Sequence, residues 1–251
     1  MRYNAAPERR AAIEKVLRSS GYVSSAEMSG KIGVSEMTIR RDLRLMETMG
    51  VVRRVAGGAM LRTQGGLSFE RRDSIGAAQK HAIAEASARI VQGAAMVAID
   101  AGTTAAGVAP LIEEAMVVTH SLPVISTMAS QAPDRLISLG GHYQPATRSF
   151  TGPIATATLR DMHCDFALIS AAAVNPQGTW SINVLEANIK RALIEHSRTV
   201  VLMADASKVG RTAPLKVADW GEIDIMVTGR GADSEVLDSI RAHDVEVRLV
   251  G

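Results

Sequence analysis

The residues best suited to bind a ligand follow short apolar segments in the second half of the chain. Residues 100–104 read Asp-Ala-Gly-Thr-Thr and come directly after the apolar segment 96–99. Glycine lets a ligand approach the backbone, and hydroxyls at the start of an expected helix suit an anion such as phosphate. Residues 205–208 follow another such segment with Asp205, which suits sugar hydroxyls, and Lys208, which suits phosphate. These residue types indicate non-covalent binding of a phosphorylated molecule.

Two further apolar segments also end in small or polar residues. Thr119, His120 and Ser121 follow residues 116–118, and Gly140 and Gly141 follow residues 136–139. Each motif alone is a common turn, and His120 fits a structural role as well as a binding role. Ligands of parallel sheets bind at the carboxyl ends of the strands. Four such motifs at successive strand ends therefore support one another as parts of one pocket.

A second chemically distinctive group lies on one side of an expected helix bounded by Ser35 and Gly50. Ser35 suits the N-cap, and Gly50 can adopt the left-handed conformation that ends a helix. One side of this helix is an apolar stripe of Ile39, Leu43 and Met46. Guanidiniums on the other side suit phosphate oxygens and the O6/N7 edge of guanine, although the same charges fit a solvated surface helix. That side carries Glu36, Met37, Arg40, Arg41 and Arg44.

The neighbouring segments favour the nucleic-acid interpretation of this helix. Residues 24–27 have the spacing of a capping box and begin a short helix that extends to Ile32, and residues 33–35 form a tight turn. This order is a helix-turn-helix. A first helix over residues 8–20 completes a three-helix core, and residues 51–59 predict two short strands that carry Arg53 and Arg54. The result is a winged helix-turn-helix domain over residues 1–61.

The remainder of the chain predicts an α/β domain. Residues 62–74 show little periodicity and are expected to form a linker. Short apolar runs then alternate with helical segments over residues 75–251, which indicates a mostly parallel sheet covered on both faces. Helices are expected over 77–91, after 104, after 123, and over 154–162, 186–196 and 234–242. Strands are expected over 96–99, 116–118, 136–139, 166–170, 200–204, 225–227 and 245–250.

The motifs of the first domain resemble those of the DeoR family of bacterial transcriptional regulators. The resemblance rests on residues 34–43, followed by Gly50, Arg54 and residues 57–59. The family usually has histidine before its Gly-Gly-Ala motif, whereas this chain has Ala56. The resemblance implies a DNA-binding regulator, with operator DNA as its partner.

The second domain resembles the sensor domain of the same family, which is similar to the ribose-5-phosphate isomerase fold. The resemblance implies an effector pocket for a phosphorylated sugar. The family usually has Thr-Asn-Ser where this chain has His120 in the middle, a change that concerns which sugar fits. The residues that the motifs and the resemblance together assign to the pocket or its frame are Asp100, Gly102, Thr103, Thr104, His120, Ser121, Gly140, Gly141, Glu186, Lys190, Asp205 and Lys208.

Charge and composition agree with a two-part regulator. The net charge is +2, but residues 1–64 hold 12 of the 28 basic and 6 of the 26 acidic residues, so the positive charge is concentrated there. Aromatic residues make up 3%, which argues against a stacking platform for single strands. Cys164, the single cysteine, is expected to be a buried apolar residue. We expect no cofactor, no metal, no membrane span and a cytoplasmic location.

Two other functions compete with this interpretation. The first is a sugar-phosphate isomerase-like enzyme, because residues 205–208 are similar to an isomerase motif and Glu186 lies where a general base is expected. The acidic Asp-Gly-Ala-Asp stretch of those enzymes is missing after Asp165, and so is their lysine and glycine run, which favours sensing over catalysis. The second is an architectural DNA binder, which needs no anion pocket.

The expected mechanism is control of operator binding by a phosphorylated sugar. One small domain buries too little surface for tight specific binding, so a homo-oligomer, either a dimer or a tetramer, is expected to bind repeated half-sites. Repression of a carbohydrate-catabolism operon is the commonest mode that the resemblance implies. The residues expected to contact DNA are Ser35, Glu36, Met37, Thr38, Arg40, Arg41, Arg44, Arg53 and Arg54.

Overall fold

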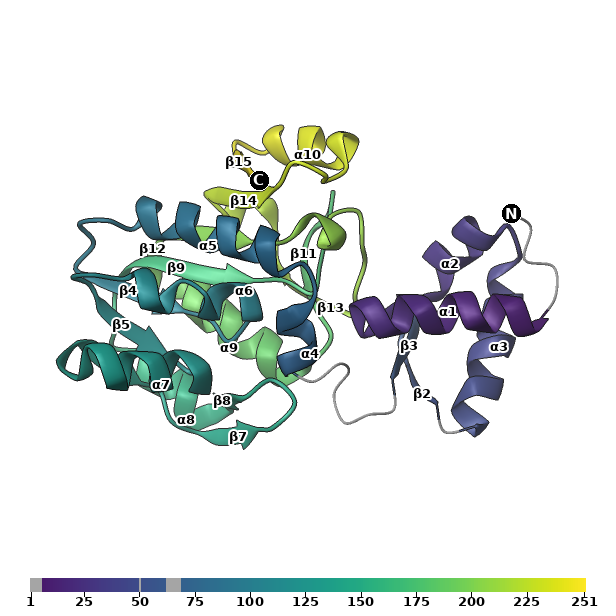
Figure 1. Ribbon diagram of the computed structural model, residues 1–251, viewed down its shortest axis with the longest axis horizontal. Helices are drawn as coiled ribbons and strands as arrows, with labels where there is room; N and C mark the ends of the chain where they lie inside the picture. Colours follow the sequence, from purple (N-terminus) through teal and green to yellow (C-terminus); the bar gives the residue numbers. More distant parts are fainter. Residues whose placement is uncertain (1–5, 50, 62–68) are drawn as a thin grey trace.

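The computed structural model describes residues 6–49, 51–61 and 69–251. Figure 1 shows two parts side by side, a small head (residues 6–61) and a larger α/β body (residues 69–251). No helix among these described residues is long and apolar enough to cross a bilayer. The predicted combination of a winged helix-turn-helix with a parallel α/β domain is confirmed.

The head is a three-helix core closed by a small sheet. Helices α1 (Ala6–Ser20), α2 (Ser25–Ile32) and α3 (Glu36–Thr48) surround an apolar cluster whose fully buried members include Ile13, Leu17 and Ile39. The wing consists of β2 (Val52–Val55) and β3 (Gly58–Leu61), which pair antiparallel as predicted. A third strand, β1 (Tyr22–Ser24), pairs with β3 and was not predicted, because three residues are too few for a recognisable alternation.

Local hydrogen bonds begin the helices where the sequence indicated. Ser24 and Ser35 are the N-caps of α2 and α3, and each side chain accepts a bond from the N–H three residues on. Helix α3 ends with Met49 as its C-cap, and Gly50, the predicted end, lies outside the described residues. The carboxylate of Glu27, expected to complete a capping box, accepts instead from the backbone N–H of Thr212 in the body, at 2.6 Å.

A buried ion pair fixes α3 against α1. The Arg9 guanidinium donates to both carboxylate oxygens of Asp42, and both side chains are almost fully buried. The Asp42 hydrogen bond is the main cause that raises the pKa of Arg9 above its ordinary value. Asp42 therefore orients the helix from its inner side, while the neighbouring residues Arg40 and Arg41 remain exposed.

The body is built on a seven-stranded sheet in which every pairing is parallel. The chain starts at a central strand, runs outward in one direction, and then returns to extend the sheet in the other. The point of reversal lies between β4 and β9, and such switch points open a crevice at the carboxyl ends of the strands. The strands are β4 (Met96–Ile99), β5 (Met116–Thr119), β6 (Leu136–Ser138), β9 (Cys164–Ser170), β12 (Ser197–Met203), β14 (Ile225–Gly229) and β15 (Glu246–Val250), in the order β15-β14-β12-β9-β4-β5-β6.

Helices cover both faces of this sheet, as the continuous apolar strands predicted. Alternate residues along each strand enter two separate clusters, so Val97 and Ile99 of β4 face one layer while Ala98 faces the other. The first layer contains α5 (Ala77–Ile90), α6 (Thr103–Ala106) and α7 (Leu122–Gln131). The second contains α8 (Pro153–Leu159), α9 (Val184–Glu195) and α10 (Ser234–Arg241). Cys164 is buried and free, as predicted.

The expected linker over residues 62–74 is corrected by the structure. Residues 62–68 lie outside the described residues, but Phe69–Ser74 forms helix α4. Phe69 is buried under the guanidiniums of Arg72 and Arg148, each 5.7 Å from the ring centroid, and this contact joins α4 to the body. A six-residue helix with one aromatic anchor has too short a pattern to be recognised in the sequence.

Two small antiparallel sheets were also not predicted, because their strands have three or four residues each. One is the hairpin of β7 (His142–Gln144) and β8 (Ser149–Thr151). The other has the order β10-β11-β13, with strands Ala173–Asn175, Gly178–Ser181 and Leu215–Ala218. Short 3-10 helices cover Ala109–Leu111, Pro133–Arg135, Ala206–Lys208 and Trp220–Glu222.

The wing requires glycine at position 58. A Cβ atom there would lie 1.9 Å from the carbonyl oxygen of Val23 on the paired strand, so Gly58→Ala must separate β3 from β1. We expect this substitution to destabilise the head by about 1–3 kcal/mol or more. Gly30→Ala is the matched control, because Gly30 lies in α2 with nothing near its Cβ position, and it should stabilise by about 0.5–1 kcal/mol. Urea unfolding measures both, and equal effects would contradict this account of the wing.

Candidate binding sites

A cavity of about 550 Å³ opens at the carboxyl ends of the central strands. Its walls come from the body and also from the head, which supplies residues of β2 and β3 and the turn after α1. Several residues that the sequence assigned to the pocket line it, namely Gly102, Thr103, Thr104, Glu186, Lys190, Asp205 and Lys208. The others do not line it, namely Asp100, His120, Ser121, Gly140 and Gly141.

Asp100 lies behind the cavity and holds its base together. One carboxylate oxygen accepts from the backbone N–H of Ser170 at 3.0 Å, from the Ser170 hydroxyl at 2.5 Å, and from the Lys190 ammonium. The other oxygen faces His120 Nε2 at 3.2 Å. Asp100 is fully buried. The carboxylate thus joins the end of β4 to the end of β9 and to helix α9, across the switch point of the sheet.

The charges around Asp100 keep it ionised despite its burial. Burial raises the pKa of a carboxyl group, but the nearby Lys190 ammonium and the bonds from His120 and Lys190 outweigh that effect, so the pKa of Asp100 lies well below its ordinary range. Gly102 makes this packing possible, because a Cβ at that position would lie 2.0 Å from the Ser170 hydroxyl.

His120 supports the pocket from behind instead of lining it. Its ring is fully buried, with Nδ1 3.0 Å from the carbonyl oxygen of Phe150 and Nε2 facing Asp100. The imidazole therefore has a polar partner at each of its ring nitrogens. Ser121 is likewise buried and caps α7, and Gly141 packs against the backbone of Thr151 with a positive φ of 113°. These residues therefore support the cavity without lining it. For His120, this is the structural role that the sequence left open beside a binding role.

The cations of the cavity are more numerous than the sequence analysis indicated. Arg72 of α4 and Lys80 of α5 also line it; Arg72 lies in the segment expected to be a linker, and Lys80 lies in the helix expected over residues 77–91. Burial lowers the pKa values of Arg72, Lys80 and Lys208, and mutual repulsion adds to the effect on the two lysines. No ion pair to any of these three is found among the described residues. An anion in the cavity would supply the missing charge partner.

Two carboxylates oppose these cations at the cavity wall. Glu186 Oε1 accepts hydrogen bonds from Ser149 at 2.6 Å and Thr147 at 2.9 Å. Asp205 is the N-cap of a short 3-10 helix and accepts from the backbone N–H and the hydroxyl of Ser207. Carboxylates fixed in this way are suitable acceptors for ligand hydroxyls.

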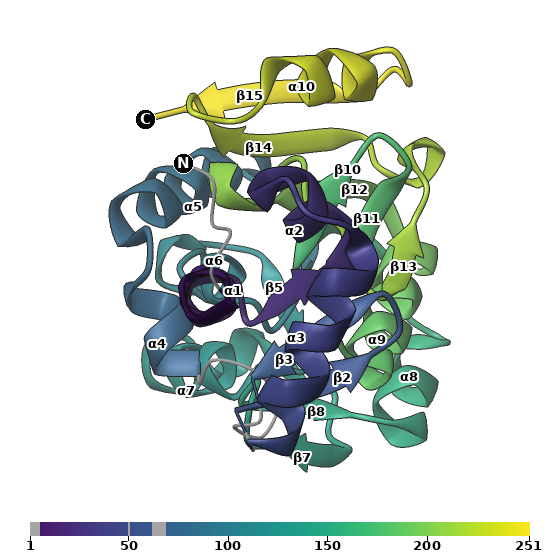
Figure 2. The same cartoon turned by 90° about the vertical axis from the view of Figure 1, so that its right-hand side faces the viewer.

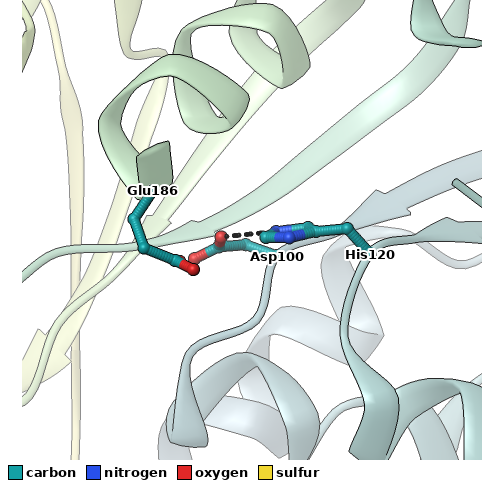
Figure 3. Close-up of side chains that lie close together, drawn as sticks. All are labelled: Asp100, His120 and Glu186. Atoms are coloured by element: carbon teal, nitrogen blue, oxygen red, sulfur yellow. Dashed lines mark hydrogen bonds and ion pairs between the residues drawn. The ribbon is translucent and has the colours of Figure 1, made fainter. Parts of the chain in front are cut away.

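The carboxylate–imidazole group in Figure 3 has the composition of a metal site but not its chemistry. Ligand atoms of Asp100, His120 and Glu186 lie within 4.8 Å of one another. The Lys190 ammonium already occupies Asp100, and both nitrogens of His120 are bound. A metal would have to displace the lysine and one of the contacts of the ring. This group therefore fits a framework of hydrogen bonds better than a cation site.

The second candidate site is the outer side of α3. Met37 is 72% exposed there, and a groove between α3 and the wing is lined by Met37, Arg40, Arg41, Arg44 and Arg54. Arg40 pairs with Glu36 at 2.6 Å, and Arg54 pairs with Glu47 at 3.3 Å. The hydroxyls of Ser35 and Thr38 bond to each other at the start of the helix, 2.8 Å apart. This surface presents guanidiniums and a helix start together, which suits a phosphate backbone.

Arg53 is separated from the other residues expected to contact DNA. It lines the cavity and not the groove beside α3, because successive residues of a strand point to opposite faces.

Comparison with known proteins identifies the two parts. A model of the DeoR C-terminal sensor domain matches residues 76–230, and a model of the DeoR-like helix-turn-helix domain matches residues 9–65. The chain belongs to the DeoR family. It is therefore a DNA-binding transcriptional regulator, which confirms the resemblance and favours a regulator over an enzyme.

Relatives of this DeoR-family chain match along nearly its whole length. An Escherichia coli O157:H7 protein described as an aga operon transcriptional repressor is 30% identical, over 100% of this chain and 96% of that one. The glycerol-3-phosphate regulon repressor of Haemophilus influenzae is 30% identical, over 86% and 87%. The L-fucose operon activator of the same organism is 28% identical, over 91% and 94%.

The solved structures include a ribose 5-phosphate isomerase from Methanocaldococcus jannaschii, with 15% identity, a TM-score of 0.37, and coverage of 51% of this chain and 52% of that one. This likeness is too low to carry an argument, so the similarity of the DeoR sensor to that fold stays a prediction.

The Asp100 framework makes a testable contribution to stability. Asp100→Asn leaves the buried Lys190 without its charge partner, and we expect a loss of about 3–5 kcal/mol at pH 7. Because the folded-state pKa of Asp100 is depressed, the advantage of the wild type is complete above pH about 5 and declines as the pH falls below about 4. Unfolding at several pH values measures the difference. The exposed Asp238→Asn is the control and should be nearly neutral, whereas a loss at Asp100 that persists unchanged at pH 3 would contradict the assignment.

Proposed function

We propose that this regulator binds a phosphorylated sugar in the cavity of its body and that the bound ligand controls operator binding by the head. The observation that carries this proposal is the group of cations, Arg72, Lys80 and Lys208, that line one cavity and form no ion pair among the described residues, although the Asp205 carboxylate lies near both lysines. A phosphate dianion meets their charge, and it also suits the start of α6 at Thr103 and Thr104.

The other end of the ligand is assigned to the carboxylates. Glu186 and Asp205 lie at the same cavity and accept hydrogen bonds, as sugar hydroxyls require. Asp100 and His120 hold the base of the pocket in place without touching the ligand. The names of two relatives refer to an L-fucose operon and to a glycerol-3-phosphate regulon, which agrees with a ligand of this class.

The outer side of α3 is the proposed DNA interface, and it enters the major groove. Ser35 and Thr38 contact phosphates, and Arg41 and Arg44, which have no ion pair among the described residues, contact phosphate or guanine. Arg40 and Glu36 enter the groove as an ion pair. The exposed Met37 enters with them from α3, and Arg54 contacts the DNA from the wing. We propose residues 1–61 as the DNA-binding unit and assign α4 with the rest of the body to the sensor.

A homo-oligomer is part of the proposal, because a single head presents one short recognition helix to DNA and repeated half-sites multiply the contact. The relatives include an activator as well as repressors, so the family membership alone leaves the sign of regulation open. We propose repression of a carbohydrate-catabolism operon, relieved by the ligand.

Thermal melting against a panel of phosphorylated sugars tests the ligand assignment. A ligand that binds the folded state raises the melting midpoint by mass action. We expect at least one member of the panel to raise it and the corresponding unphosphorylated sugar not to. Lys208→Ala should remove the rise while leaving operator affinity unchanged. A panel without any hit, or a hit that Lys208→Ala leaves intact, would refute the pocket.

The DNA interface makes a separate prediction about salt dependence. Arg41→Ala should weaken operator binding about tenfold and lower the slope of log K against log salt by about 1 per head, because one phosphate contact is lost. Arg198→Ala removes the same charge from an exposed site on the body and serves as the control. Fluorescence anisotropy with the chain's own upstream DNA at several salt concentrations measures both, and identical behaviour of the two variants would exclude this face of α3.

A further inference from the structure

The head supplies part of the wall of the body's cavity. We propose that Arg53 on the wing is a ligand-binding residue of the body's cavity, so that the DNA-binding head itself closes over the bound anion. This inference rests on the proposed function and adds a residue and a route of control to it. It assigns Arg53 to the ligand site and its neighbour Arg54 to the DNA interface.

The two faces of β2 explain why Arg53 and Arg54 have different roles. Val52 is buried in the core of the head, and Arg54, two residues along on the same face, pairs with Glu47 of α3. Arg53 and Val55 point to the opposite face and line the cavity. Across the sheet, the partner of Arg53 is Met60, which faces the same way. The wing therefore has a face toward the recognition helix and a face toward the body.

The body covers the second face of the wing. Tyr22 and Met60 of the head form one apolar cluster with Ala173 and Ala213 of the body, and Trp180 packs against it. Burial raises the pKa of Tyr22 to about 12, with the Glu27 carboxylate adding to the effect. Figure 2, which looks from the head toward the body, shows β3 and β2 in front of the body's strands.

A polar contact fixes the head at the same boundary. Glu27 Oε1 accepts from the backbone N–H of Thr212 at 2.6 Å, and this carboxylate is the one that a capping box would have used within the head. Glu27 therefore bonds to the body instead of to the backbone of the head. Both the apolar cluster and this bond lie beside the mouth of the cavity, where Pro214 and Leu215 are lining residues.

Arg53 is a cation of the cavity wall that forms no ion pair with the part of the chain that the structure describes. Among the described residues, its side chain contacts the sulfur of Met60, at 3.9 Å, which is a weak acceptor. The cavity behind it already holds Arg72, Lys80 and Lys208. A guanidinium binds phosphate oxygens in a planar, two-bond geometry, so an anion in the cavity can accept from Arg53 and the body's cations together.

The consequence is a direct coupling between ligand and head. An anion that bridges Arg53 and the body is bound more tightly when the head is docked than when it is undocked. The ligand therefore shifts the head toward the docked position by that difference in affinity. No relay through the sheet is needed, because the moving part is itself a wall of the pocket.

Neighbouring arginine variants in the full-length chain test this inference. Binding of inorganic phosphate and of ribose 5-phosphate is measured by calorimetry for the wild type, Arg53→Ala, Arg53→Lys, Arg54→Ala and Lys208→Ala. We expect Arg53→Ala to weaken binding about tenfold, Arg53→Lys to restore part of it, and Arg54→Ala to stay within twofold of the wild type. Operator affinity without added anion should show the reverse order, with Arg54→Ala weakened and Arg53→Ala within twofold.

The outcomes separate this inference from the proposed function. If Lys208→Ala loses anion binding while Arg53→Ala keeps it within twofold, the body binds the anion without any contact from the head. The inference is then wrong, while the proposed function stands. If the wild type binds neither anion, both the inference and the proposed function for this ligand class are wrong.

A ligand-free measurement tests the docking itself. In a Trp220→Phe background, Trp180 is the remaining tryptophan, and its emission reports on the packed cluster. Glu27→Ala should shift that emission to longer wavelength by undocking the head, while the exposed Glu235→Ala in α10 should not. Identical spectra for the two variants would overturn the docked arrangement.

Discussion

The pocket depends on one buried carboxylate. Asp100 ends the first strand of the sheet, and its bonds to Ser170, Lys190 and His120 tie together the strands on both sides of the switch point. Three positions around it are restricted by this arrangement. Gly102 has no room for a side chain, Lys190 has its charge neutralised, and His120 is held away from the cavity. The remaining cations at the cavity, Arg72, Lys80 and Lys208, form no ion pair among the described residues, and we propose that their positive charge selects an anion.

The same logic extends to the boundary between the two parts of the chain. The wing is a thin sheet with two used faces, one against the recognition helix and one against the body. A sheet of this kind cannot change its contact with the body without moving α3, because Val52 packs in the same core as Ile39 and Leu43. On our proposal, the anion beside Arg53 and the DNA along α3 contact opposite sides of this one unit.

The sequence predicted most of the fold because its long elements have clear periods. The parallel strands are continuous apolar runs, and the recognition helix has a serine N-cap and an apolar stripe. The site was predicted less completely. Asp100 and Lys208 were named from motifs and Lys190 from the family resemblance, but neither signal can tell a residue that lines a cavity from one that supports it, as His120 shows. Arg72 was missed because its position depends on the contact with Phe69, and Lys80 because its ammonium is held by the backbone carbonyl of Arg72. The role that we propose for Arg53 depends on the docking of the head, and none of these contacts leaves a local pattern.

The central claim is that binding of the anion and binding of DNA are coupled because both shift the position of the head. Thermodynamic reciprocity tests this coupling most directly. The affinity for the phosphorylated sugar is measured on free protein and on protein saturated with operator, and operator affinity is measured with and without saturating sugar. The account predicts that bound operator lowers the affinity for the sugar by the same factor by which bound sugar lowers the affinity for operator. We expect this factor to be about fivefold or more. A sugar affinity that is unchanged by bound operator would contradict it.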